Sequence, residues 1–245
     1  MRKKLVIDCF FDNFPKYKNG YAIVAVDVIR ATTTAITGVS LGRQCFPVAS
    51  IEEATLLAQK LENPLLVGEL GGNMPYNFHL QNSPTQLESR TDLHRSMILL
   101  STSGTQLICE FKNSEVTYIA CLRNYISLIA HLQEFHSAVA LIGAGARGEF
   151  RREDQLCCAW IAEGLISQGF EPEDEKTSKI VQHWSGKSVD AILEGNSAAY
   201  LTRSGQVKDL EFILSHVADL NFIYRLENDQ IVEQIIPQNT AIVSI

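Results

Sequence analysis

The chain has 245 residues, 46% of them apolar, and a formal net charge of −7 at pH 7. This length allows a well-buried core, and we expect residues 1–245 to form a single α/β domain. The acidic balance argues against nucleic-acid binding, which normally needs a basic face. No apolar run approaches the roughly 20 residues that cross a bilayer, so the sequence predicts a cytoplasmic protein without a membrane partner.

Short apolar runs alternate with segments of helical periodicity along the first two thirds of the chain. Strands are predicted at residues 21–28, 45–49, 64–68, 96–101, 115–120 and 138–142. Helices are predicted at residues 31–41, from 51 to about 61, 104–111, 124–135 and 152–167, the second of them opened by a capping box of Ser50 and Glu53. This alternation predicts a three-layer α/β/α fold with a mostly parallel central sheet.

The last third of the chain is less regular. Residues 169–177 are acidic and are expected to form a solvated loop, followed by two or three helices up to about residue 218. Residues 222–226 and 230–236 flank a short polar turn, a pattern that favours a β-hairpin. We expect this hairpin to cap the sheet or to add an antiparallel strand at its edge.

Each of four polar clusters follows a predicted strand. They span residues 27–34, 69–84, 101–105 and 143–154. We expect all four on one edge of the sheet, where open α/β sheets bind ligands.

The first cluster places Asp27 and Arg30 directly after a buried apolar run. One interpretation is a helix cap paired with an arginine. The other is a ligand site in which Asp27 holds a metal ion and Arg30 holds an anion. The hydroxyls of Thr32, Thr33 and Thr34 would then bind phosphate at the start of a helix.

The second cluster contains Glu69 within a Gly-Glu-Leu-Gly-Gly segment. This segment is either a flexible turn or a loop whose glycines allow close backbone approach, with Glu69 as metal ligand or base. At the far end of the same loop, Asn82 and Ser83 would add hydrogen bonds to a substrate.

The third cluster combines hydroxyl and glycine residues at a predicted helix start. It can cap the helix, cradle an anion, or do both. Its members are Ser101, Thr102, Ser103, Gly104 and Thr105.

The fourth cluster contains a literal G-x-G-x-x-G at residues 143–148, which raises a dinucleotide site as a rival interpretation. The helix that follows leads into an acidic loop rather than an apolar strand, contrary to that fingerprint. Glu153 and Asp154 at the helix start either suit its dipole or bind a metal. Arg147 is a second candidate anion clamp.

Five motifs in order carry a family resemblance. They are Asp-Val-Ile-Arg-Ala-Thr-Thr-Thr at 27–34, Gly-Glu-x-Gly-Gly at 68–72, Asn-Ser-Pro at 82–84, Thr-x-Gly-Thr at 102–105 and Gly-x-x-x-x-Phe-x-x-Glu-Asp-x-x-Cys at 145–157. Together they resemble the 2-phosphosulfolactate phosphatase family over roughly residues 5–170. Beyond that, Gly205-x-x-x-Asp209 and Ala218-Asp219 are similar to the family's tail.

The resemblance implies a Mg²⁺-dependent phosphatase acting on the phosphomonoester of a small anionic 2-hydroxy acid. Two or three carboxylates among Asp27, Glu69, Glu153 and Asp154 would hold the metal. Water or a covalent Ser, Thr or Asp is left open as the nucleophile, and homo-oligomerisation is left open too.

The chain departs from the family pattern at two positions. Leu70 stands where the family usually has arginine, and Ser103 where it usually has asparagine. These departures motivate one alternative, a homologue that binds an anionic metabolite without catalysis. A second alternative, a nucleotide-binding oxidoreductase, is motivated only by residues 143–148.

Overall fold

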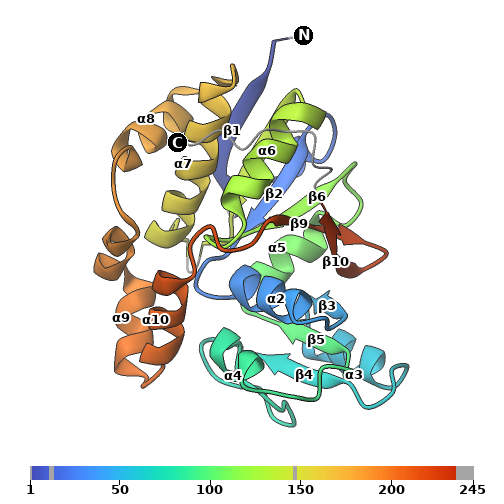
Figure 1. The fold of residues 1–245 in the computed structure, drawn as a ribbon. Coiled ribbons are helices and arrows are strands. Elements are labelled where there is room, and N and C mark those ends of the chain that lie inside the picture. Colours follow the sequence, from blue (N-terminus) through green and yellow to red (C-terminus); the bar gives the residue numbers. More distant parts are fainter. Residues whose placement is uncertain (1, 11–13, 146–147, 236–245) are drawn as a thin grey trace.

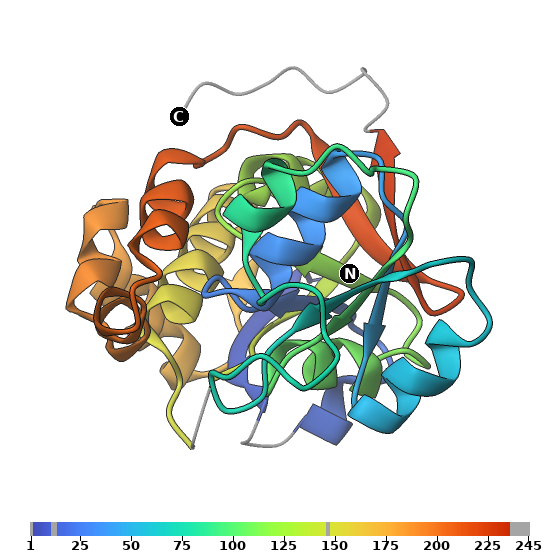
Figure 2. The same cartoon turned by 90° about the horizontal axis from the view of Figure 1, so that it is seen from below.

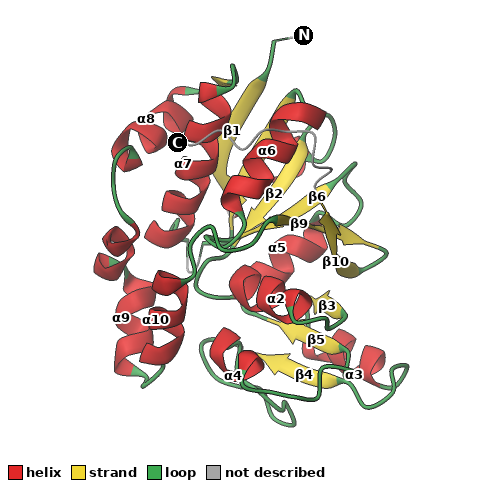
Figure 3. Ribbon diagram, in the orientation of Figure 1, coloured by secondary structure: helices red, strands yellow, loops and turns green. Residues whose placement is uncertain are grey.

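The computed structural model describes residues 2–10, 14–145 and 148–235 of the chain. Ten strands form one mixed, mostly parallel sheet with helices on both faces, so the predicted α/β class is confirmed (Figure 3). The strands are β1 (Lys4–Cys9), β2 (Ala22–Val26), β3 (Cys45–Val48), β4 (Leu65–Gly68), β5 (Met97–Leu100), β6 (Thr117–Ala120), β7 (Ala138–Gly143), β8 (Glu171–Pro172), β9 (Phe222–Glu227) and β10 (Gln230–Ile235).

The strand order is β4-β5-β3-β10-β9-β6-β2-β7-β1-β8. The predicted hairpin, β9–β10, therefore lies inside the sheet, and the expectation of a cap or an edge strand is wrong. Its position follows from pairing on both sides, because β10 pairs antiparallel with β3 and β9 pairs antiparallel with β6.

The hairpin divides the sheet into two parallel blocks. Because β3–β10, β10–β9 and β9–β6 are all antiparallel pairs, the block β4-β5-β3 runs opposite to the block β6-β2-β7-β1-β8. Figure 1 shows the two blocks steeply inclined to each other. The expectation that all four polar clusters share one sheet edge is thus wrong, because it assumed a single parallel sheet.

The sequence of β2 is an unbroken apolar run because both faces of the strand are buried. Val24 and Val26 pack into one core cluster, and Ile23 and Ala25 pack into another on the opposite face. Side chains alternate between the two faces of a strand, so a strand covered on both faces is apolar at every position.

Different helices cover the two faces. The helices α2 (Ala31–Ser40) and α5 (Gly104–Glu110) pack with Ile23 and Ala25, whereas α6 (Tyr125–Phe135), α7 (Arg152–Ser167) and α8 (Glu175–Trp184) pack with Val24 and Val26. The remaining helices are η1 (Phe14–Tyr17), α3 (Ile51–Ala58), α4 (Pro84–Glu88), η2 (Val189–Glu194), α9 (Asn196–Arg203) and α10 (Val207–Ser215). Within the described ranges, no helix is long and apolar enough to span a membrane.

Local signals predicted several elements closely. Helix α7 has the bounds expected from the sequence. The Ser50 cap of α3 is confirmed, because the Glu53 N–H donates to Ser50 Oγ, and the Glu53 carboxylate reaches back to the Ala49 N–H, one residue before the cap. Strand β1 was not predicted, and the acidic segment 169–177 is not a plain loop, since it contains β8 and the first turn of α8.

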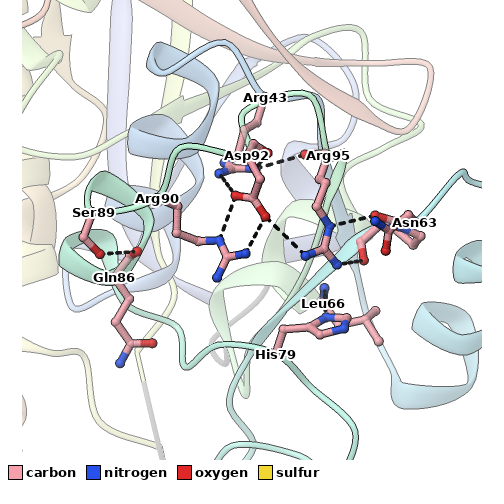
Figure 4. Close-up of polar contacts among 10 residues, drawn as sticks. Arg43, Asn63, Leu66, His79, Gln86, Ser89, Arg90, Asp92 and Arg95 are labelled. Atoms are coloured by element: carbon pink, nitrogen blue, oxygen red, sulfur yellow. Dashed lines mark hydrogen bonds and ion pairs between the residues drawn. The ribbon is translucent and has the colours of Figure 1, made fainter.

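Asp92, on the connection between α4 and β5, bonds to three arginines (Figure 4). The carboxylate accepts hydrogen bonds from Arg43 at 2.8 Å, from Arg90 Nε at 2.8 Å and from Arg95 at 3.3 Å. Arg95 also donates to the carbonyl oxygens of Asn63 and Pro64. This network ties the segments preceding β4 and β5 to the end of α2. The Arg90 guanidinium, followed by Arg43 and Arg95, holds the pKa of Asp92 well below its usual range.

The substitution Asp92→Asn should lower the free energy of unfolding by about 2 kcal/mol near pH 7, since the side chain of Arg43 is fully buried and loses its counter-charge. A carboxylate whose pKa falls on folding stabilises the protein above its unfolded pKa of about 3.9, and the effect disappears as the pH drops toward the folded value. The difference between the two proteins should therefore shrink below about pH 4.

Urea unfolding of both proteins over this pH range provides the measurement. Glu88→Gln, which changes an exposed carboxylate on α4, is the matched control and should change stability little at any pH. A deficit in Asp92→Asn that is the same at all pH values would contradict the electrostatic explanation.

Candidate active site

A cavity of about 450 Å³ lies where the loops after β2, β4, β5 and β7 meet. Asp27 and Arg30 line it from the first loop, Glu69 and Asn82 from the second, Thr102 and Ser103 from the third, and Gly145 and Asp154 from the fourth. All four polar clusters predicted from the sequence therefore contribute to one cavity. They converge although the two strand blocks run in opposite directions within the sheet.

Asp27 lies at the end of β2 and is 8% exposed. Its backbone is fixed by Thr32, whose Oγ1 donates to the Asp27 carbonyl oxygen at 2.7 Å. Its carboxylate accepts the Ala31 N–H and packs against Gly104, where a Cβ atom would overlap Oδ2. Burial, followed by the negative charge of Glu69, raises the pKa of Asp27 to about 7.

Two further carboxylates lie in the first turn of α7. Asp154 Oδ1 accepts the Val28 N–H at 2.9 Å and Oδ2 accepts the Gly145 N–H at 3.3 Å, which joins the loops after β2 and β7. Glu153 is 1% exposed and does not line the cavity, and its Oε2 has no hydrogen-bond partner. Burial raises the pKa of both groups, with the charge of Asp27 as the next cause for Asp154.

Glu69 fastens two loops together. Its carboxylate accepts the Gly72 N–H at 2.7 Å, the Thr102 N–H at 2.8 Å and the Thr102 hydroxyl at 2.9 Å. The Gly71 N–H in turn donates to Thr102 Oγ1 at 2.7 Å. Both carboxylate oxygens are therefore engaged, and Glu69 holds the loops after β4 and β5 in a fixed relation.

Arg30 is held by a carboxylate that the sequence analysis did not assign to the site. It follows a cis peptide bond after Ile29, and its Nη1 donates to Asp209 Oδ2 of α10. Asp209 Oδ1 also accepts the Ser83 hydroxyl at 2.7 Å and the Thr85 hydroxyl at 2.6 Å. The only sequence signal for Asp209 was its similarity to the family's tail.

Several predicted hydroxyls bond within their own turns. Thr32 and Thr33 donate to carbonyl oxygens five residues earlier, at 2.7 and 2.8 Å. Ser101 Oγ accepts the Thr105 N–H, and Thr105 Oγ1 accepts the Ser101 N–H. The Thr34 hydroxyl is buried without a partner. None of these five residues lines the cavity, and their contact with phosphate stays a prediction.

The loop between β7 and α7 contains the G-x-G-x-x-G match. A Cβ atom at Gly143 would collide with the Phe150 ring, so this glycine leaves space for an aromatic side chain of its own loop. Gly145 has a φ of +59°, which favours glycine. Arg147 lies outside the described residues. Arg151, which the sequence analysis did not single out, lines the cavity.

The two positions that depart from the family pattern lie differently. Leu70 is partly buried and packs against a small core cluster with Val48 and Phe78. Ser103 lines the cavity, and its hydroxyl makes no cap hydrogen bond to α5.

Helix α9 forms one wall of the cavity, which sequence reasoning missed. Tyr200 and Arg203 are among its lining residues, and the Tyr200 hydroxyl donates to the Gly72 carbonyl oxygen at 2.7 Å. Figure 2 shows α9 and α10 beside α7, to one side of the strands. A short helix with polar residues on one side resembles a surface helix, so its sequence carries no distinct signal for a site.

Comparison with known proteins identifies the class as phosphoric monoester hydrolase. Residues 11–229 match the family model described as 2-phosphosulpholactate phosphatase. A probable 2-phosphosulfolactate phosphatase of Pseudothermotoga lettingae is 38% identical over 142 residues, which cover 58% of this chain and 61% of that protein. Its counterpart in Thermotoga maritima is 33% identical over 190 residues, covering 77% and 82%.

A more distant relative matches nearly end to end. The 2-phosphosulfolactate phosphatase of Methanothermobacter thermautotrophicus is 27% identical over 227 residues, which cover 91% of this chain and 95% of that protein. Since the family model spans most of the sequence, the chain belongs to the 2-phosphosulfolactate phosphatase family. This confirms the resemblance noted from the five motifs.

The packing of Asp27 against Gly104 leads to a prediction. In Gly104→Ala the new methyl group would overlap Asp27 Oδ2 and lie 2.6 Å from the Ala31 Cβ atom, so the carboxylate must move. We expect at least a tenfold lower kcat/KM for phosphate release, roughly the effect of a small misplacement of a catalytic group. The accompanying loss of stability should be about 1–3 kcal/mol.

Gly38→Ala is the matched control. It adds the same methyl group to α2, where the first atom met is the flexible Met97 Cε at 2.6 Å. This variant should retain the wild-type kcat/KM. Full activity in Gly104→Ala would show that the close packing of Asp27 against α5 does not matter for catalysis.

Proposed function

We propose that the chain hydrolyses the phosphomonoester of a 2-hydroxy acid, with 2-phosphosulfolactate as the first substrate to test. The observation that carries this proposal is the meeting of Asp27, Asp154 and Arg30 in one cavity of a member of this family. The names of its relatives supply the substrate class. The proposed products are the hydroxy acid and inorganic phosphate.

We further propose that the site uses Mg²⁺. Burial raises the pKa of the carboxyl groups of Asp27, Glu153 and Asp154, because it disfavours their charged forms, and a cation beside them would favour those forms. Glu153 Oε2 also lacks a hydrogen-bond partner. A divalent cation suits such a donor set, because Mg²⁺ prefers carboxylate oxygens.

Among the carboxylates, Asp27 and Asp154 are the best candidates to hold the ion, since both line the cavity. The described residues contain no group of three or more His, Cys, Asp or Glu side chains in a metal-binding arrangement. A site of one or two carboxylates agrees with this, because Mg²⁺ usually keeps several waters and binds substrate phosphate. Glu69 is a weaker candidate, because three hydrogen bonds already engage it.

The remaining groups have separate tasks in this proposal. Arg30, oriented by Asp209, would bind the phosphate or the adjacent carboxylate through its guanidinium fork. Ser103 and Asn82 line the cavity without hydrogen bonds from their side chains to described residues, so both can bond to phosphoryl oxygens. When bound, Mg²⁺ would offset the charge that develops on those oxygens.

Leu70 and Ser103 favour one alternative, a homologue that binds an anionic metabolite without turnover. Stabilisation of the protein by phospho-acids without phosphate release would support that alternative. Measurable turnover would exclude it.

The test is phosphate release from 2-phosphosulfolactate and 2-phospholactate. We expect turnover with Mg²⁺, its loss in EDTA and its recovery when Mg²⁺ is restored. Asp27→Asn should lower kcat/KM at least about 100-fold, because it removes one of the two carboxylates that would hold the ion. Equal rates with and without EDTA would remove the metal from the proposal.

Asp190→Asn is the matched control for a lost carboxylate. Asp190 is exposed on η2 and does not line the cavity, so this variant should behave as the wild type. Undiminished activity in Asp27→Asn would exclude that residue from catalysis, whatever the result with EDTA.

A further inference from the structure

Helix α9 presents a polar face to the cavity that the proposed hydrolysis does not use. The lining residues of α9 are Asn196, Ser197, Tyr200, Leu201 and Arg203. Residues three, four and seven apart share one face of a helix, so this set forms a continuous stripe along α9.

Contacts with three of the cavity loops hold this wall in place. Leu201 is 1% exposed and packs in a cluster with Leu210 and Ile29, the residue before Arg30. The Tyr200 hydroxyl bonds to the loop after β4, and the Asn196 amide donates to Glu149 in the loop after β7 at 3.1 Å. These contacts hold the backbone of α9 in place, and the side chain of its last residue, Arg203, is exposed.

Three guanidinium groups line the cavity, and two of them are paired. Arg30 donates to Asp209, and Arg151 donates to Glu149 at 2.6 Å. Arg203, at the end of α9, has no ion pair or hydrogen bond from its side chain to any residue in the described part of the chain. A cation without a partner at a cavity wall is available to an anionic ligand.

We propose that Arg203 recognises the acid group of the substrate that is remote from the phosphate, a second carboxylate or a sulfonate. This inference rests on the proposed function. A cavity of about 450 Å³ is large enough for a compact polyanion. The arginine fork matches the two oxygens of a carboxylate, or two of the three oxygens of a sulfonate. Arg203 thereby selects hydroxy acids with two acid groups over those with one.

The kinetic test compares phosphate release from 2-phosphosulfolactate and 2-phospholactate, which differ by the sulfonate. In Arg203→Ala, the ratio of kcat/KM between the first and the second ester should fall about 10- to 100-fold, mainly through KM. Arg203→Lys should restore part of this ratio, since lysine keeps the charge but lacks the fork. Lys208→Ala, which removes an exposed charge on α10 outside the cavity, should leave the ratio at the wild-type value.

A binding measurement separates this inference from the proposed function. Calorimetry with sulfolactate and with lactate needs no turnover, so it gives an answer even if the wild type hydrolyses neither ester. A preference for sulfolactate that Arg203→Ala abolishes supports the role of Arg203. The inference is overturned if the wild type shows no such preference. It is also overturned if Arg203→Ala keeps the preference, or weakens the binding of both ligands equally.

Discussion

A buried ion pair between Arg30 and Asp209 joins the last third of the chain to the site. Arg30 is 5% exposed and Asp209 is 3% exposed, so both charges have left water and depend on each other. Pairs of this kind add little net stability, because the cost of desolvation offsets the attraction. Their usual effect is to fix one arrangement, and here Ser83 and Thr85 donate to the same carboxylate. One residue of α10 thus orients the cavity-lining arginine and the start of α4.

Around this pair the cavity is lined by both acidic and basic side chains. Asp27 and Asp154 lie within bonding distance of backbone N–H groups, which stabilise their charged forms, yet burial still dominates and raises both pKa values. The Asp154 carboxylate accepts the Val28 N–H from the loop after β2, and the Glu69 carboxylate accepts the Thr102 N–H from the loop after β5, so neighbouring loops are cross-linked.

The sequence predicted what depends on neighbouring residues and failed where distant segments meet. The alternation of apolar runs and amphipathic helices, the capping box at Ser50 and the bounds of α7 are local signals, and they predicted most elements. The position of the hairpin between β3 and β6 is not local, because alternating apolar residues show that a strand is half buried but not which strand it pairs with. Strand β1 was missed because its apolar run is short and is interrupted by Asp8.

The same division holds for the site. Asp27, Glu69 and Asp154 stand out because each follows a strand within a polar cluster, and all three line the cavity. Tyr200 and Arg203 come from an amphipathic helix, where a polar residue is the rule, so only the folded chain reveals them, and Asp209 had no sequence signal beyond its similarity to the family's tail. Motif chemistry also gave no hint that Glu69 would be engaged by three donors.

The central position of the hairpin has a consequence for biosynthesis. Until residues 222–235 emerge, β3 and β6 each present an unpaired edge, and the two parallel blocks have no strand between them. Exposed edges of this kind invite pairing with other chains. If the strands on either side fold before the hairpin is made, the gap between them leaves two edges open to other chains, and solubility during synthesis then depends on how quickly β9 and β10 fill it.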